Sequence, residues 1–215
     1  MIIRSPYPDV DVPEISLPGF VLSRADQRGA APAVIDAPTG RTLSYRELNA
    51  QVRRVAAGLR ARGVARGDVL ALCAPNGPEF VVTYYAAASA GAAITPVNPV
   101  ATSGEIAAQL TAAGARWLVT TPEVFRDKGR QAAAGAGVRE SFIYGAAGGA
   151  TPFASLTGAA PDGSPPGISP GDLMLVPFSS GTSGLPRGVM LTHRQLVASL
   201  CQLPCVHLAL CPPCG

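Results

Sequence analysis

The stretch at 178–193, FSSGTSGLPRGVMLTH, places a loop rich in hydroxyl groups and glycine between two apolar segments. The run from Leu173 to Phe178 predicts a strand that enters the loop, and Val189 to Leu191 predicts a second strand that leaves it. Glycines within the loop let the backbone approach a ligand closely and adopt positive φ, so that successive N–H groups can converge on an anion. The sequence therefore predicts an anion-binding loop that follows a strand.

The side chains of this loop suit the outer phosphates of a polyphosphate. Its serine and threonine hydroxyls donate hydrogen bonds, the proline stiffens the turn, and the arginine brings a permanent positive charge that matches phosphate oxygens. The predicted phosphate-binding residues are Ser179, Ser180, Gly181, Thr182, Ser183, Gly184, Pro186, Arg187 and Gly188.

Two other interpretations of the loop are weaker. A Walker A loop has the pattern G-x-x-x-x-G-K-[ST], but these glycines are spaced differently, and Val189 follows Gly188 where lysine is required. A flexible Ser/Gly linker is the second alternative. Linkers are not usually flanked by two apolar strands with a Pro-Arg pair between them, so the phosphate-loop interpretation is favoured.

The segment resembles the phosphate loop of the adenylate-forming superfamily, which includes acyl- and aryl-CoA synthetases, luciferase-like enzymes and peptide-synthetase adenylation domains. The family pattern is Ser-Ser-Gly-Thr-Thr-Gly-x-Pro-Lys-Gly, followed by an apolar strand and Thr-His. Here Ser183 stands at the second threonine and Arg187 at the lysine. The hydroxyl and the charge are kept, but a wide planar guanidinium replaces a compact ammonium. As a whole the chain looks most like 4-coumarate–CoA ligase-type enzymes.

The resemblance covers about residues 15–202 and implies activation of a small-molecule carboxylic acid. The acid would attack the α-phosphate of ATP, release pyrophosphate and form an acyl-adenylate, and a thiol, usually that of CoA, would then displace AMP. The loop would hold the β- and γ-phosphates, with Mg²⁺ sharing their charge. The family's acid-pocket, adenine, ribose and C-terminal lysine motifs are missing from this sequence. We therefore assign no catalytic residue and expect the isolated chain to be inactive.

Two alternatives to a CoA ligase remain open at this point. The chain could be a module that binds phosphate without turnover, or an α/β interaction domain whose loop is merely a turn. Carboxylate-dependent exchange of pyrophosphate with ATP separates the ligase from both alternatives. ATP titration of the parent chain and of an Arg187→Ala variant separates the phosphate-binding module from the interaction domain.

Strand and helix patterns alternate along the chain, which predicts an α/β fold with a doubly wound, mostly parallel sheet and helices on both faces. By resemblance, this is the incomplete N-terminal part of the large domain of an adenylate-forming enzyme. Ligands of such sheets bind beyond the carboxyl ends of the strands, where the predicted loop lies. Strands are expected at 33–36, 42–43, 69–73, 93–96, 117–120 and 141–144, and helices at 19–29, 44–63, 78–90, 102–114, 122–134 and 192–203.

The domain organisation is expected to have three parts. Residues 1–32 are an extended N-terminal segment, residues 33–203 a partial AMP-binding domain, and residues 204–215 an irregular tail rich in cysteine and proline. Within the domain, Phe153 to Leu156 is expected to dock a surface excursion onto the body. Trp117 and Cys73 are expected to be core residues, and His193 to have a capping or packing role.

Composition argues against nucleic acid and membrane partners. The 215 residues carry 17 basic and 14 acidic side chains, a net charge of +3 that is too weak and scattered for a nucleic-acid surface. The N-terminus has no continuous apolar core and is not a secretion signal. The uncharged run at 80–100 is weakly apolar and is interrupted by Pro96 and Pro99, which favours a buried helix and strand over a membrane span. We expect a cytoplasmic protein.

The C-terminal end differs in composition from the rest. Cys201, Cys205, Cys211 and Cys214 lie there with His207, and the last two have C-x-x-C spacing. Because the gap between the pairs is short and prolines intervene, no metal site is predicted. The run after Gln202 departs from what a ligase would show and suggests a truncated or frameshifted product. The downstream nucleotide sequence tests this, since an open frame with the missing ligase motifs would support it.

Overall fold

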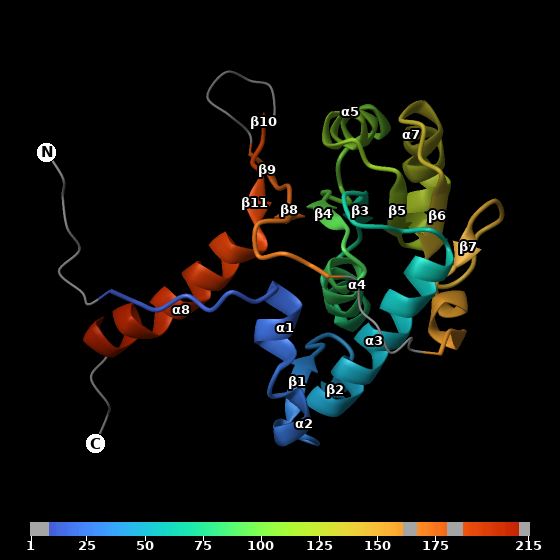
Figure 1. The fold of residues 1–215 in the computed structure, drawn as a ribbon. Coiled ribbons are helices and arrows are strands. Elements are labelled where there is room, and N and C mark those ends of the chain that lie inside the picture. Colours follow the sequence, from blue (N-terminus) through green and yellow to red (C-terminus); the bar gives the residue numbers. More distant parts are fainter. Residues whose placement is uncertain (1–8, 161–166, 180–186, 211–215) are drawn as a thin grey trace, which may run out of the picture.

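The computed structural model describes residues 9–160, 167–179 and 187–210, with 204–210 described by backbone alone. Figure 1 shows the elements along the chain. The helices are α1 (Leu17–Leu22), α2 (Ala25–Arg28), α3 (Tyr45–Ala61), α4 (Pro78–Ser89), α5 (Ser103–Ala113), α6 (Pro122–Val124), the π-helix η1 (Phe125–Gly129), α7 (Arg130–Gly135), the 3-10 helix η2 (Phe153–Gly158) and α8 (His193–Leu210). The strands are β1 (Pro32–Ile35), β2 (Thr42–Ser44), β3 (Val69–Cys73), β4 (Ala93–Pro96), β5 (Trp117–Thr120), β6 (Glu140–Ile143), β7 (Thr151–Pro152), β8 (Leu173–Leu175), β9 (Phe178–Ser179), β10 (Arg187–Gly188) and β11 (Leu191–Thr192).

The main sheet has the strand order β11-β8-β4-β3-β5-β6-β7. Its pairs are parallel except for β11, which runs antiparallel to β8 at one edge. Every residue of the central strand β3 is buried, as expected for a strand covered on both faces. The predicted doubly wound, mostly parallel sheet is confirmed, and β3 to β6 lie within one residue of their predicted positions.

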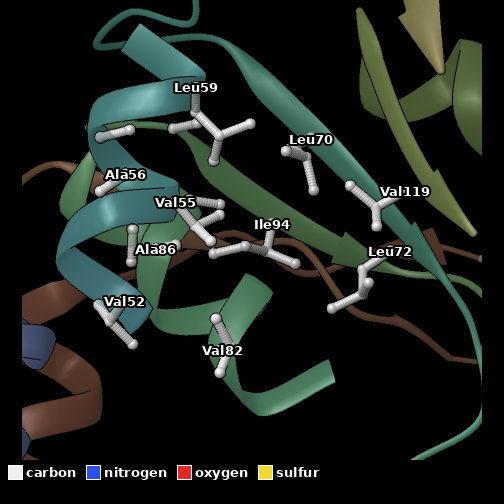
Figure 2. Close-up of a cluster of buried hydrophobic side chains, with 14 of the residues drawn as sticks. Val52, Val55, Ala56, Leu59, Leu70, Leu72, Val82, Ala86, Ile94 and Val119 are labelled. Carbon is white, nitrogen blue, oxygen red and sulfur yellow. The ribbon is translucent and has the colours of Figure 1, made fainter. Parts of the chain in front are cut away.

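Helices cover both faces of this sheet (Figure 1). The side chains of each strand alternate, so that Leu70 and Leu72 contribute to the core under α3 and α4, whereas Ala71 and Cys73 contribute to the core under α5 and α7. Figure 2 shows the first core, where α3 and α4 meet β3, β4 and β5. Its labelled side chains are Val52, Val55, Ala56, Leu59, Leu70, Leu72, Val82, Ala86, Ile94 and Val119.

Capping residues define where the longer helices begin. Ser44 and Glu47 form a capping box at the start of α3, and the Thr102 hydroxyl and Glu105 form another at the start of α5. Thr192 pairs with Gln195 in the same way before α8. These local signals are readable in the sequence, which explains why the predicted helix starts agree with the structure.

The N-terminal segment, expected to be extended with one short helix, contains two. The chain folds into α1 and α2, separated at Ser23, whose hydroxyl donates to the carbonyl oxygen of Phe20 at 2.9 Å. This side-chain hydrogen bond competes with continuation of the helix. The strands expected at 33–36 and 42–43 follow as β1 and β2, which pair in antiparallel fashion across the turn at 37–39.

The prediction of one continuous strand from Leu173 to Phe178 is wrong. The structure has β8 and β9 as separate short strands with Pro177 between them, because proline has no N–H to donate to a ladder. The second predicted strand, Val189 to Leu191, is displaced. Its place is taken by β10 and β11, and Val189 and Met190 between them are exposed.

The predicted irregular tail from Pro204 also needs correction, because α8 continues to Leu210. One proline removes a single backbone donor, and the Leu-Ala-Leu sequence that ends the helix consists of strong helix formers. The other predicted tail residues, 211–215, lie outside the described residues. In the described part of the chain, none of the helices has both the length and the hydrophobicity needed to cross a bilayer.

Candidate functional site

The predicted phosphate loop leaves the sheet beyond the carboxyl end of β8. Its two ends are joined by a short antiparallel ladder in which Arg187 pairs with Ser179 and Gly188 pairs with Phe178. The backbone N–H of Val189 donates to the carbonyl oxygen of Pro177 at 2.9 Å and continues this closure. Figure 1 shows β9 and β10 projecting beyond β8 and β11. The loop therefore has a defined base at the sheet edge where ligands of α/β folds bind.

The structure brings three of the predicted site residues together. Ser179, Arg187 and Gly188 all lie on the paired base of the loop, and all are exposed. Ser180, Gly181, Thr182, Ser183, Gly184 and Pro186 lie outside the described residues. Within the described ranges, no acidic side chain forms an ion pair with Arg187. Arg187 is exposed to solvent on the paired base of the loop.

Gly188 has a role that the sequence pattern did not reveal. A Cβ atom at this position would lie 3.1 Å from Cζ of Phe178 and 3.2 Å from Cγ1 of Val176. The missing side chain thus lets β10 pack closely over β9. This glycine closes the base of the loop, whatever its backbone contributes to a ligand.

His193 has the structural role expected of it. Its side chain is 1% exposed, and Nδ1 accepts a hydrogen bond from the backbone N–H of Leu17 at 3.1 Å. The imidazole therefore ties the first residue of α8 to the first residue of α1. Burial lowers the pKa of His193 below its ordinary value of 6.5, and the nearby Asp172 carboxylate opposes this shift.

This contact predicts a pH dependence of stability. The folded chain holds His193 neutral, whereas the unfolded chain binds a proton below about pH 6.5. The contribution of neutral His193 to the free energy of unfolding is therefore complete above that pH, and it decreases as the pH falls toward the lowered pKa of the folded chain. Urea unfolding at a series of pH values between about 5 and 8 measures the slope. Arg66 holds the pKa of Asp172 below its ordinary 3.8, so this carboxylate stays charged throughout.

The matched variant for this measurement is His193→Asn, whose amide oxygen can accept the Leu17 hydrogen bond without titrating. We expect it to flatten the slope of stability against pH. The other histidine of the chain, His207, is present in both proteins. Equal slopes for the two proteins would show that His193 does not cause the pH dependence.

A second concave feature lies at the carboxyl edge between β3 and β5, where the strand order reverses. It is a pocket of about 400 Å³ lined by the segment after β3, by Thr121, by Tyr144 and by the β1–β2 turn. Arg41 is paired with Glu79, and Tyr144 donates to the carbonyl oxygen of Glu79 at 3.0 Å. Because these polar groups already bind one another, we assign no ligand to the pocket.

No metal centre emerges from the described residues. No group of three or more His, Cys, Asp or Glu side chains among them is arranged to hold a metal ion. Cys73 is buried in the core as predicted, and burial raises the pKa of its thiol to about 11. The side chains of Cys205, His207, Cys211 and Cys214 lie outside the described part.

Comparison with known families decides what kind of protein has this loop. The family model of AMP-binding enzymes matches residues 22–211. The chain belongs to that family. The match confirms the superfamily inferred from the loop, and it extends past Gln202, where the resemblance was thought to end.

Similar curated proteins place this AMP-binding chain near plant ligases. It is 39% identical to 4-coumarate–CoA ligase 3 of Oryza sativa subsp. japonica over 203 residues, which cover 94% of this chain and 36% of that protein. It is 35% identical to 4-coumarate–CoA ligase 4 of Arabidopsis thaliana, with 94% and 38% covered. The chain thus spans well under half the length of these relatives.

Solved structures agree on the fold of this AMP-binding chain. A long-chain-fatty-acid–CoA ligase from Archaeoglobus fulgidus superposes with a TM-score of 0.84 at 27% identity, covering 94% of this chain and 41% of that protein. The luciferase-like enzyme of Zophobas morio gives 0.82 at 22% identity, with 90% and 46% covered, which supports the fold alone. The architecture is that of the N-terminal part of the large domain of adenylate-forming enzymes.

Proposed function

We propose that this chain is the phosphate-binding part of an ATP-dependent acid–CoA ligase of the aryl- or acyl-CoA type. The proposal rests chiefly on one observation. A hydroxyl- and glycine-rich loop is closed at its base by β9 and β10, beyond the carboxyl end of β8, with Arg187 exposed on that base. The similarity to 4-coumarate–CoA ligases supports the same reaction class.

In this proposal the loop binds the departing end of ATP. Arg187 and the hydroxyls of the loop hold the β- and γ-phosphates while a carboxylate attacks the α-phosphate, pyrophosphate leaves and an acyl-adenylate forms. The thiol of CoA then attacks the acyl carbon and displaces AMP. Positioning and charge neutralisation account for most of the catalysis in such transfers. Mg²⁺ would accompany the phosphates and share their charge.

The isolated chain is proposed to bind polyphosphate but not to complete the reaction. It covers 36–39% of the length of three similar 4-coumarate–CoA ligases of Oryza sativa subsp. japonica, and the motifs for the acid, adenine and ribose are absent from it. The remaining part of the enzyme is accordingly a required partner. A cytoplasmic location is part of the proposal, because ATP and CoA are both available there.

The proposal predicts that Arg187→Ala weakens binding of ATP and of pyrophosphate by about tenfold or more, since hydrogen bonds to charged groups contribute about 1.5–3 kcal/mol. Isothermal titration calorimetry of the purified chain with Mg²⁺ measures this. Arg187→Lys restores the residue of the family pattern and should retain affinity. Arg54→Ala, an exposed arginine on α3, removes the same charge away from the loop and should bind as the parent does.

Two results would contradict the proposal. Equal affinity of the parent and Arg187→Ala proteins would exclude the loop as the phosphate site and favour an interaction module. Carboxylate-dependent exchange of pyrophosphate into ATP by the isolated chain would show that it is active without the missing part.

A further inference from the structure

A buried polar bridge connects α5 to the strand that enters the loop. Thr95 lies in the middle of the sheet on β4 and is 0% exposed. Its hydroxyl donates to the carbonyl oxygen of Val176 at 2.9 Å and accepts a hydrogen bond from Nε2 of Gln109 at 3.0 Å. The same amide nitrogen donates to the carbonyl oxygen of Pro96 at 2.9 Å. Neither side chain belongs to a motif that is visible in the sequence.

Val176 is the residue at which the chain leaves the main sheet. Its N–H donates to the carbonyl oxygen of Ile94 at 2.8 Å, and the next residue, Pro177, has no N–H with which to extend the ladder. The carbonyl oxygen of Pro177 instead accepts from Val189, on the far side of the loop. Both ends of the loop therefore depend on where residues 176 and 177 are held.

We propose that Thr95 and Gln109 are positioning residues for the phosphate loop. The inference rests on the proposed function, because it concerns how the loop is presented to a polyphosphate. The two side chains fix the carbonyl of Val176, which fixes the start of β9 and, through the Pro177–Val189 hydrogen bond, the return of the chain at β10. Arg187 is carried on that returning strand, so the bridge sets where its guanidinium stands.

The geometry supports positioning over packing alone. On the β4 side the pairing of β8 has a single register pair, Ile94 with Leu175, and on the other side Leu175 pairs with Leu191 of β11. Backbone pairing to β4 alone therefore holds the end of β8 by few contacts. A threonine hydroxyl supplies the next connection, in the direction of the loop. Gln109 then satisfies the second hydrogen-bonding position of that hydroxyl from α5, which anchors the bridge to the helical layer.

The chain contains a close control for this bridge. Thr120 on β5 is also 0% exposed, and its hydroxyl donates to the carbonyl oxygen of Cys73, at the end of the neighbouring strand β3, at 2.6 Å. Thr95→Val and Thr120→Val thus delete the same kind of hydrogen bond from the same sheet. Only the first deletion acts on the strand that leads to the loop.

Two measurements test the proposal. The first is the hydrogen–deuterium exchange rate of peptides that contain the Val176 and Val189 amides, without ligand. The second is calorimetric affinity for inorganic pyrophosphate and for ATP with Mg²⁺. We expect Thr95→Val to exchange faster at both amides and to bind pyrophosphate about fivefold more weakly, as for loss of one buried hydrogen bond. Thr120→Val should change neither, and Thr95→Ser should restore both.

Gln109→Leu, a change at a half-buried position, provides a second variant in case Thr95→Val does not fold. It should weaken pyrophosphate binding in the same direction. If the parent chain binds pyrophosphate and the Thr95 and Gln109 variants bind it as tightly as Thr120→Val, the positioning role is overturned while the proposed function stands. If the parent chain itself does not bind pyrophosphate or ATP, the proposed function fails, and the role of the bridge toward phosphate fails with it.

Discussion

Replacing Gly58 with alanine is expected to lower the free energy of unfolding by at least ~3 kcal/mol, the upper end of the usual range for overpacking. Gly58 lies in α3 against the 3-10 helix η2. A Cβ atom there would stand 2.2 Å from the carbonyl oxygen of Leu156 and 2.7 Å from its Cα. Both are backbone atoms, so no side-chain rotation can relieve the contact. Either α3 or η2 has to move, and Leu156, which is fully buried, would lose its packing.

The control for this substitution is Gly104→Ala in the first turn of α5. Apart from its chain neighbours and the backbone of its own helix, no described atom lies within 4 Å of the added Cβ at Gly104. Both changes replace a helical glycine with alanine, and Gly104→Ala should be neutral or stabilising by up to ~1 kcal/mol. Guanidinium unfolding followed by circular dichroism measures both. A Gly58→Ala protein as stable as Gly104→Ala would show that η2 does not pack on α3 as the structure has it.

The surroundings of Gly58 also show which features the sequence predicts and which it does not. The apolar spacing of Leu48, Val52, Val55 and Leu59 predicts the helix, and in that pattern a glycine looks only like a weak position. The docking of Phe153 and Leu156 is predictable from two apolar residues in a polar stretch. The close contact between the backbones of α3 and η2 depends on the tertiary structure, so no local sequence pattern predicts it.

The candidate site likewise has a part that the sequence predicts and a part that it does not. Composition and spacing identify the loop, because glycine, hydroxyl and arginine are each needed there for a separate chemical reason. The break at Pro177 was readable in principle, since proline cannot extend a ladder, but the apolar run around it concealed the signal. The bridge from Thr95 to Gln109 was not readable. A threonine in an apolar strand is ordinary, and its partner becomes known only when β4, β8 and α5 are placed together.

The wrong prediction of an irregular tail, where α8 continues to Leu210, has another cause. A cluster of cysteine and proline suggested an irregular tail, but α8 includes Pro204 and continues to Leu210, although the proline cannot donate a backbone hydrogen bond. Compositional contrast between segments is therefore weaker evidence about structure than periodicity is. The same contrast misplaced the end of the family resemblance, which the family match carries to residue 211.

Trp117→Ala is expected to cost ~3–5 kcal/mol, the usual range for removing a large aromatic side chain from a core. The Trp117 side chain is 0% exposed and stacks on Phe142, with ring centroids 6.2 Å apart and an interplanar angle of 14°. Its Nε1 donates to Oδ2 of Asp68 at 3.2 Å, just before β3. The ring thus links β5 to the residue that precedes β3 and to Phe142 of the neighbouring strand β6.

Trp117→Phe separates the two contributions, because it keeps an aromatic ring on Phe142 and removes only the indole donor. Asp68 would still accept from the backbone N–H of Ala65 at 3.1 Å, so this variant should lose less than half of what Trp117→Ala loses. Trp117 is the single tryptophan of the chain, so unfolding has to be followed by circular dichroism instead of fluorescence. Equal losses in the two variants would mean that the hydrogen bond to Asp68, and not the buried ring, holds the strands together.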